Sequence, residues 1–284
     1  MHPQLFTIHE VGERLAPYVR RVLHAEAQIE LVIRPAPTGY VYLGSIFNSG
    51  AIYVVDGERE IHSSTGWHFS GQLRNHNLRV RYHGHVGHLL AEFTPTGFYR
   101  LTGIPAQRLT NAAADVVTFS ASLAKRLATV KLDAFSPVER VHIVEQCLVK
   151  LIPQARVEDH VVAQAARMLE ESNGSARIDQ IAAELEVSER TLCRRFQRIV
   201  GVTPKYFGQV RQINYAVEML MADNVAALTA IAHRGGFYDQ SHFIKAMHTF
   251  FEQGPQQFLN SRDPQLATFL GKSRRVTAAA PSER

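Results

Sequence analysis

The chain reads SERTLCRRF at residues 188–196 and DQSHFIKAM at residues 239–247, and these two stretches carry one pattern twice. Each position of the first copy has its counterpart 51 residues later: Ser188, Leu192, Phe196, Pro204 and Phe207, then Asp239, Phe243, Met247, Pro255 and Phe258. An Ile-Ala pair precedes each copy, at residues 181–182 and 231–232. The repeat predicts two helix-turn-helix units joined by one long amphipathic helix over residues 205–222.

Each copy predicts a capped helix with one buried face. Ser188 and Asp239 are residue types that cap a helix N-terminus. Apolar residues then recur at the spacing of one helix face: Leu192, Phe196 and Ile199 in the first copy, and Phe243, Met247 and Phe250 in the second. A Pro that can start the next helix follows each copy. We therefore expect recognition helices over residues 188–200 and 239–251.

The faces opposite these apolar rows are polar. The first helix carries Arg190, Arg194, Gln197 and Arg198 there, and the second carries Ser241, Lys245, His248 and Thr249. Guanidinium groups one turn apart suit the O6/N7 edge of guanine and DNA phosphates. On a lone helix such a face indicates only a solvated surface. The recurrence of the whole capped pattern favours DNA recognition.

The two copies resemble the paired DNA-binding motifs of AraC/XylS-type transcription regulators. The first motif comprises Ile181-Ala182, residues 188–196, Gly201-Val202-Thr203-Pro204 and Phe207; the second runs from Ile231 to Phe243 and includes Lys245. The resemblance covers roughly residues 158–262. The chain departs from the family pattern with Met247 for Phe, Glu252 for Gly, Gly254 for Ser or Thr, and Leu259 for Arg. The first two changes are expected to be tolerated, and the last removes a potential contact.

The resemblance implies which residues read bases: Arg190, Cys193 and Arg194 in the first unit, and Gln240, Ser241 and Lys245 in the second. Cys193 offers at most an apolar contact, whereas Arg198 and Lys205 suit phosphate. The predicted DNA-binding residues are Arg190, Thr191, Arg194, Arg198, Lys205, Gln240, Ser241 and Lys245. Arg195 flanks the core side, and either a neighbouring Glu or DNA would suit it as partner. Double-stranded promoter DNA is the implied partner; RNA polymerase, a small-molecule effector and a second copy of the chain are further candidates.

Residues 1–152 have a different texture. Residues 15–24 are expected to form a short helix. Short β-branched and aromatic runs follow, separated by turn residues, at residues 29–33, 40–46, 51–55, 78–82 and 89–93. Such runs predict an antiparallel barrel or sandwich. The resemblance implies a sensor or dimerisation domain here, often a cupin-like barrel. The predicted fold class is therefore α+β, with a β-rich region first and an all-α region last.

Two helices are expected between residues 111 and 152. One contains Val117, Leu123 and Leu127, and the other contains Val141, Val144, Leu148 and Leu151 after a break at Phe135-Ser136-Pro137. They could pair with a second subunit or cover their own barrel. The predicted domains are residues 1–152 and 153–262. The tail, residues 263–284, is expected to be disordered.

Net charge by itself does not indicate nucleic-acid binding. The chain carries a formal charge of +5, but residues 158–262 hold 11 Lys and Arg against 12 Asp and Glu. The positive charge of this region is concentrated between residues 188 and 211, at Arg190, Arg194, Arg195, Arg198, Lys205 and Arg211, opposed only by Glu189. Such a local patch is the footprint expected where a helix meets the phosphate backbone.

Other function classes find less support. His83-Gly84-His85 is the seed of a potential metal site, but an acidic ligand is missing at the spacing that a metal-binding cupin needs. Trp67, Phe69, Phe98 and Tyr99 could line a ligand pocket or form plain core, and no ligand can be named. A small-molecule- or metal-binding barrel with an incidental helical domain is the alternative hypothesis. No nucleophile–base pair or phosphate-cradling loop is present, so neither catalysis nor a cofactor is expected.

The two cysteines, Cys147 and Cys193, form no CxxC pair and predict neither a disulfide nor a zinc framework. A DNA-repair protein built on the same DNA-binding module would need a reactive cysteine, which Cys147 in an apolar helix does not supply. The sequence contains no apolar run of membrane-spanning length and no signal peptide at residues 1–11. A cytoplasmic, nucleoid-associated protein is therefore expected.

Overall fold

The computed structural model describes residues 6–56, 59–63, 66–74, 78–130, 132–222 and 228–261. The tail after residue 261 lies outside this description.

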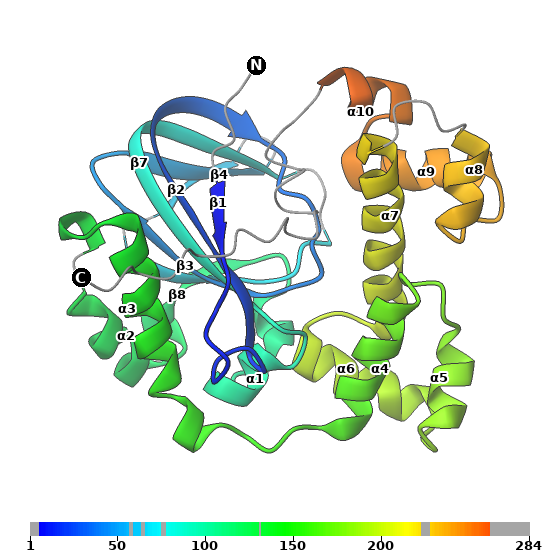
Figure 1. Ribbon diagram of the computed structural model, residues 1–284, viewed down its shortest axis with the longest axis horizontal. Coiled ribbons are helices and arrows are strands. Elements are labelled where there is room, and N and C mark those ends of the chain that lie inside the picture. The colour runs from blue at the N-terminus through cyan, green and yellow to red at the C-terminus, as the bar shows by residue number, and fades with distance from the viewer. Residues whose placement is uncertain are drawn as a thin grey trace, which may run out of the picture.

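The first part of the chain forms an antiparallel sheet that curls on itself (Figure 1). Its strands are β1 (Phe6–His9), β2 (Val19–Ile33), β3 (Tyr42–Phe47), β4 (Ala51–Asp56), β5 (Arg59–Ser63), β6 (Gly66–Ser70), β7 (Arg79–Phe93) and β8 (Ala113–Asp115). The order is β1-β2-β7-β3-β6-β8, with β4 paired to both β5 and β7. The β-rich prediction is confirmed.

The two longest strands form the spine of this sheet. β2 and β7 pair from Val19 opposite Phe93 to Ile33 opposite Val80. Because successive side chains point to opposite faces of a strand, Leu89 and Phe93 join one core cluster and Leu90 joins another. Both faces of the sheet are therefore buried along this part of β7.

Helices cover one face of the sheet. α1 (Gly97–Thr102), α2 (Ala121–Ala128) and α3 (Pro137–Val149) contribute to the same core as Leu43, Phe69 and Phe93, through Phe98, Leu123, Leu127, Val141, Val144 and Leu148. Short 3-10 turns lie between them, among them η1 (Ala106–Leu109) and η2 (Val116–Thr118). Ser136 caps α3 in a reciprocal capping box with Glu139. The two predicted helices thus pack on the sheet of their own chain.

Two local predictions fail. Residues 15–24, predicted as a helix, contain a turn and the start of β2. Helical propensity lost there because the pairing of β2 with β7 buries Val22, Leu23 and Ala25. Val117, assigned to the helix of Leu123, is exposed in the separate turn η2.

The last part of the chain is all helical. Its elements are α4 (His160–Glu171), α5 (Ile178–Glu184), α6 (Glu189–Val200), α7 (Pro204–Ala222), α8 (Leu228–Arg234), α9 (Gln240–Phe251) and α10 (Pro255–Ser261). One core gathers α4, α5 and α6 around Phe207 of α7. A second gathers α8, α9 and α10 around the later residues of α7, from Val210 to Leu220. The long helix α7 is therefore shared by both units.

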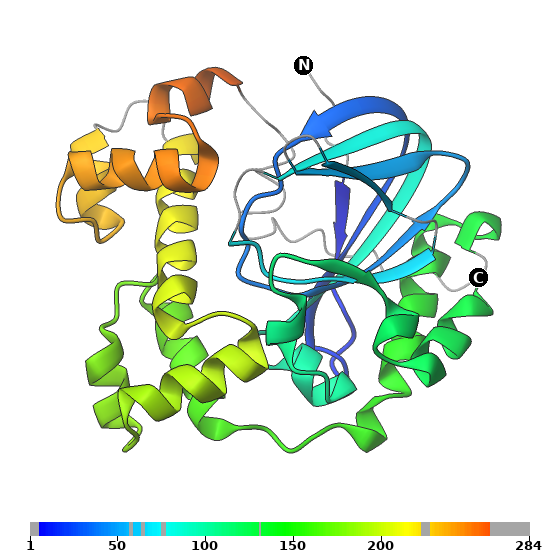
Figure 2. The ribbon, with the colours of Figure 1, turned by 180° about the vertical axis from the view of Figure 1, so that it is seen from behind.

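Figures 1 and 2 show α7 standing beside the curled sheet, with the first unit at one end and the second at the other. In the described part of the chain, no helix combines the length and apolar character that crossing a membrane requires.

Candidate nucleic-acid interface

The helix α6 is built as the repeat predicts. The Ser188 hydroxyl accepts a hydrogen bond from the Thr191 backbone N–H at 3.2 Å, which caps the helix. Leu192 and Phe196 are completely buried, so the helix is fixed against its unit through this face. The opposite side chains, Arg190, Arg194, Gln197 and Arg198, are exposed. The sequence therefore assigned the two faces of α6 correctly.

The exposed arginines of α6 differ in what they touch. Neither Arg190 nor Arg194 has a hydrogen bond or ion pair with any described residue, so both can contact a ligand. The Thr191 hydroxyl accepts a hydrogen bond from Ser188 at 2.9 Å and is partly used in the cap. Arg190 and Arg194 are exposed in the first two turns of α6, and Lys205 is exposed at the start of α7.

Cys193 lies half-buried on the same helix. Burial and then the Glu189 carboxylate raise the pKa of its thiol above the ordinary value. Burial also raises the pKa of Cys147. Both sulfurs therefore stay protonated at neutral pH, which agrees with an apolar role for Cys193 and gives neither residue the character of a reactive thiolate.

The helix α9 has the same kind of cap and buried face as α6, but its exposed face carries less positive charge. Asp239 caps it by accepting a hydrogen bond from the His242 backbone N–H at 2.7 Å. Phe243 and Met247 are completely buried, and Ser241 and Lys245 are exposed on the far side. The Gln240 side chain accepts a hydrogen bond from Thr229 at 3.1 Å. Among the described residues of α9, Lys245 is the one Lys or Arg, so this face is less basic than that of α6.

Two arginines of the predicted basic patch are used elsewhere. Arg195 forms a bidentate ion pair with Asp159, at 2.6 and 2.8 Å, so its partner is an Asp at the start of α4 rather than a neighbouring Glu. Arg211 turns away from α6 and donates hydrogen bonds to the Thr38 carbonyl at 3.3 Å and the Tyr40 hydroxyl at 3.2 Å. The sequence could not show that α7 faces the β-rich region. The part of the predicted basic patch that stays exposed is therefore Arg190, Arg194, Arg198 and Lys205.

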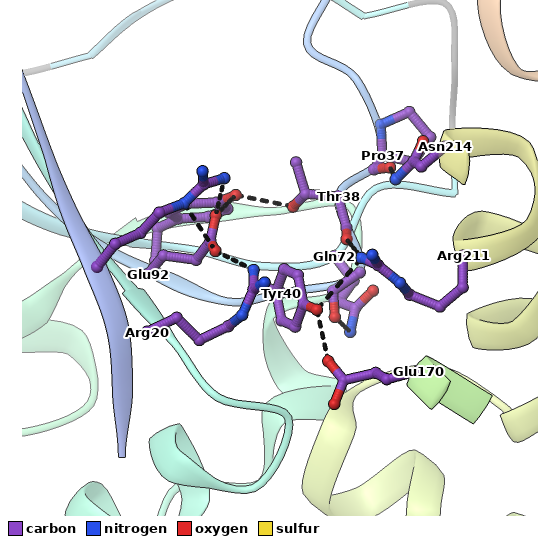
Figure 3. Close-up of polar contacts among 12 residues, drawn as sticks. Arg20, Pro37, Thr38, Tyr40, Gln72, Glu92, Glu170, Arg211 and Asn214 are labelled. Atoms are coloured by element: carbon purple, nitrogen blue, oxygen red, sulfur yellow. Dashed lines mark hydrogen bonds and ion pairs between the residues drawn. The ribbon is translucent and has the colours of Figure 1, made fainter. Parts of the chain in front are cut away.

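The β-rich region contacts the middle of the helical region at a polar junction (Figure 3). Tyr40 lies between Glu170 of α4, to which its hydroxyl donates at 2.5 Å, and Arg211 of α7. The Arg20 guanidinium stacks on the Tyr40 ring at 4.0 Å and pairs with the buried Glu92. The Asn214 amide donates to the Pro37 carbonyl at 3.0 Å. These contacts connect the interior of the sheet to α4 and α7.

The same region also holds the end of each recognition helix. Gln72 and Thr110 donate hydrogen bonds to the carbonyls of Val200, at 3.0 Å, and Gly201, at 2.6 Å. At the second unit, Arg34 and Arg79 form ion pairs with Glu252 at 2.6 and 3.1 Å. Sequence reasoning did not find these residues. The one signal was Glu252 itself, which departs from the family pattern.

The histidine-rich part of the sheet does not assemble a metal site within the described residues, where no group of three or more His, Cys, Asp or Glu could hold a metal ion. His83 pairs with Glu30, and His85 lies 3.8 Å from Glu26, on exposed strand surface. Burial lowers the pKa of His68 to about 4 and holds that of His88 well below its usual value. Both buried imidazoles are therefore neutral at pH 7.

Comparison with known proteins agrees with the repeat. A family model described as a helix-turn-helix domain matches residues 181–261. The HTH-type transcriptional activator RhaS from Shigella boydii is 33% identical over 86 residues, and RhaS from Escherichia coli O139:H28 is equally similar. Each match covers 30% of this chain and 30% of the relative, so the similarity spans less than a third of the length of these relatives.

Solved structures are similar at lower identity. A probable AraC family transcriptional regulator from Rhodopseudomonas palustris is 25% identical, with 34% of this chain and 96% of that chain covered and a TM-score of 0.30. Fatty-acid-bound ToxT from Vibrio cholerae is 11% identical, with 91% and 96% covered and a TM-score of 0.47. The sequence match and the doubled, capped units carry the assignment. The C-terminal region, residues 181–261, is therefore a helix-turn-helix domain that is similar to those of AraC/XylS-type regulators.

Proposed function

We propose that this protein is a sequence-specific DNA-binding transcription regulator. In this proposal α6 and α9 enter successive major grooves on one face of the duplex. The β-rich region, within the expected domain of residues 1–152, modulates this binding through its contacts with both units of residues 153–262. The proposed partner is promoter DNA. A small-molecule effector, a second copy of the chain and RNA polymerase remain candidates that the proposal accommodates.

The observation that carries the proposal is the placement of two exposed polar helix faces at opposite ends of one helix. The helix α7 has 19 residues, which corresponds to a length of about 28 Å. Successive major grooves on one DNA face lie about 34 Å apart. Both cores pack on α7, so the two units cannot adjust freely. We therefore expect the DNA to bend, at a cost of about 1–6 kcal/mol.

The proposed roles follow from exposure and side-chain chemistry. Arg190 and Arg194, exposed one turn apart, are proposed to read guanines through bidentate hydrogen bonds. Arg198 and Lys205 are proposed to position the protein on phosphates. The second unit would read bases through Gln240, Ser241 and Lys245. Thr191 would contact the DNA backbone from the first turn of α6. Its hydroxyl accepts a hydrogen bond from Ser188 and can donate its own hydrogen to a phosphate oxygen.

Selection of random duplexes by the purified full-length protein, at one stated salt concentration, tests this function. We expect two enriched islands about 10 base pairs apart, one for each unit. A single island would contradict base reading by the second unit. Absence of any enrichment by folded protein would contradict the regulator function as a whole.

Variants assign the islands. The double change Arg190→Ala and Arg194→Ala should erase one island while helicity is retained. Arg126→Ala on α2, an exposed arginine of the sheet-covering helices, is the matched control and should keep both. If the double variant selects the same two islands as the parent protein, α6 does not read bases.

A further inference from the structure

A hollow of about 590 Å3 lies where the first unit meets the β-rich region. Four parts of the chain line it: Tyr99 of α1, the connecting segment from Arg156 to Asp159, His160 and Val161 of α4, and Arg195, Arg198 and Ile199 of α6. The hollow is thus shared between the β-rich region, the connection and the first recognition helix.

The carboxylates around this hollow are already engaged. Asp159 receives the bidentate ion pair of Arg195, and Glu158 receives Arg100 at 2.9 Å. Arg156 and Arg198 are exposed and have no carboxylate partner in the described part of the chain. The site therefore holds two positive charges without a matching negative charge.

Both of these arginines stack on one aromatic ring. The Arg156 and Arg198 guanidinium carbons lie 5.4 and 5.7 Å from the centre of the Tyr99 ring. An aromatic face attracts a cation but does not neutralise its charge. The stacking orients the two planar donor groups beside the same hollow and leaves their N–H groups for an acceptor. Planar guanidinium forks match the oxyanions of phosphate and carboxylate groups.

We propose that this hollow is a phosphate-binding site formed by Arg156, Arg198 and Tyr99. Two unpaired guanidinium groups match the double negative charge of a phosphate monoester better than the single charge of a carboxylate. The phosphate belongs either to a small phosphate ester or to the backbone of DNA that flanks the site of α6. Because Arg198 lies on α6 and Arg156 on the connection, an occupied site ties the recognition helix to the β-rich region.

The first arm of the test needs no DNA and does not depend on the proposed function. Inorganic phosphate is titrated into the full-length protein at low salt, with binding followed by calorimetry. We expect saturable binding that Arg156→Ala and Arg198→Ala each weaken at least about tenfold, since hydrogen bonds to charged groups are lost. Arg126→Ala is the matched control and should bind as the parent does. Succinate, a dicarboxylate probe, should bind less tightly than phosphate.

The second arm identifies DNA as the source. If a backbone phosphate fills the hollow, Arg156→Ala should lower affinity for all duplexes alike. It should also reduce the slope of log K against log salt by about 0.9. Free phosphate binding with an unchanged slope assigns the site to a small phosphate ester. Absence of phosphate binding together with an unchanged slope overturns the proposal. Failure of the parent protein to bind DNA would instead overturn the function proposed above.

Discussion

The recognition helices α6 and α9 end in the same backbone conformation with different residues. Gly201 follows α6 with φ 99°, and Glu252 follows α9 with φ 55°, both in the left-handed region. Glycine adopts this conformation without a Cβ penalty, whereas for other residues it costs about 1–2 kcal/mol. The second unit therefore carries a backbone cost that the first unit avoids.

The surroundings of these two residues explain the difference. A Cβ at position 201 would lie 3.2 Å from the Ala106 carbonyl oxygen, so η1 approaches the backbone closely there. Glu252 instead extends a carboxylate to Arg34 and Arg79 of the β-rich region. The first unit is attached by close backbone packing and by the hydrogen bonds that Gln72 and Thr110 donate to its carbonyls, and the second by side-chain ion pairs that are partly exposed. Two units with the same core can thus be joined to one neighbouring region by different kinds of contact.

The core positions should show the largest effects and the closest similarity between the units. Phe196 and Met247 are equivalent, and both are completely buried. We expect Phe196→Ala to lower the free energy of unfolding by about 3–5 kcal/mol and Met247→Ala by about 2–5 kcal/mol, through lost burial and the cavity left behind. Denaturant unfolding of the full-length protein measures both. A loss below about 1 kcal/mol at either site would show that its unit lacks the packed core described here.

The exposed faces of α6 and α9 should contribute unequally to DNA affinity. Arg190→Ala should weaken binding to the selected duplex by about 1–3 kcal/mol if a bidentate contact to guanine is lost. Lys245→Ala should cost less, since a lysine presents a point charge without the planar fork. Fluorescence anisotropy at fixed salt measures both affinities, and Arg126→Ala again serves as control. A larger loss of affinity for Lys245→Ala than for Arg190→Ala would contradict the stronger base contact proposed for the first unit.

The helix caps should contribute alike in both units. Ser188→Ala and Asp239→Ala each remove an observed cap hydrogen bond, and each should lower the free energy of unfolding by about 1 kcal/mol. The loss should be somewhat greater for Asp239, whose charge also interacts with the helix dipole. Thermal unfolding of both variants beside the parent protein checks this. Equal stability of all three proteins would show that the two caps do not stabilise their helices.

Exchanging the residue after α9 should have the smallest net effect. Glu252→Gly removes about 1 kcal/mol of backbone cost and also removes ion pairs that are worth about 0–1 kcal/mol at the surface. We expect unfolding free energies within about 0.5 kcal/mol of the parent protein, with a weaker dependence on salt. Arg34→Ala, which breaks the pair and keeps the strained glutamate, should only destabilise. A stabilising Arg34→Ala would contradict the attachment described for the second unit.

Local pattern was enough to predict most of the helical region. The apolar spacing and the caps predicted α6, α7 and α9 to within one residue at each end, because these signals depend on neighbours in sequence. What failed depends on distant contacts. Residues 15–24 join a strand because β7 lies beside them, and Arg211 faces Tyr40 because α7 packs beside the sheet. Asp159 meets Arg195 only once α4 and α6 have packed.

The helix α7 fixes α6 and α9 relative to each other, and altered spacing between the two enriched islands tests this arrangement. Affinity is measured for the selected duplex and for duplexes with 5 or 10 extra base pairs between the islands. If α7 holds the units rigidly, both insertions should reduce affinity to that of a duplex with one island. The shorter insertion moves an island to the opposite face, and the longer one moves it about 34 Å further away. Full affinity at 10 extra base pairs, or no change at 5, would contradict this arrangement and show that the units bind independently.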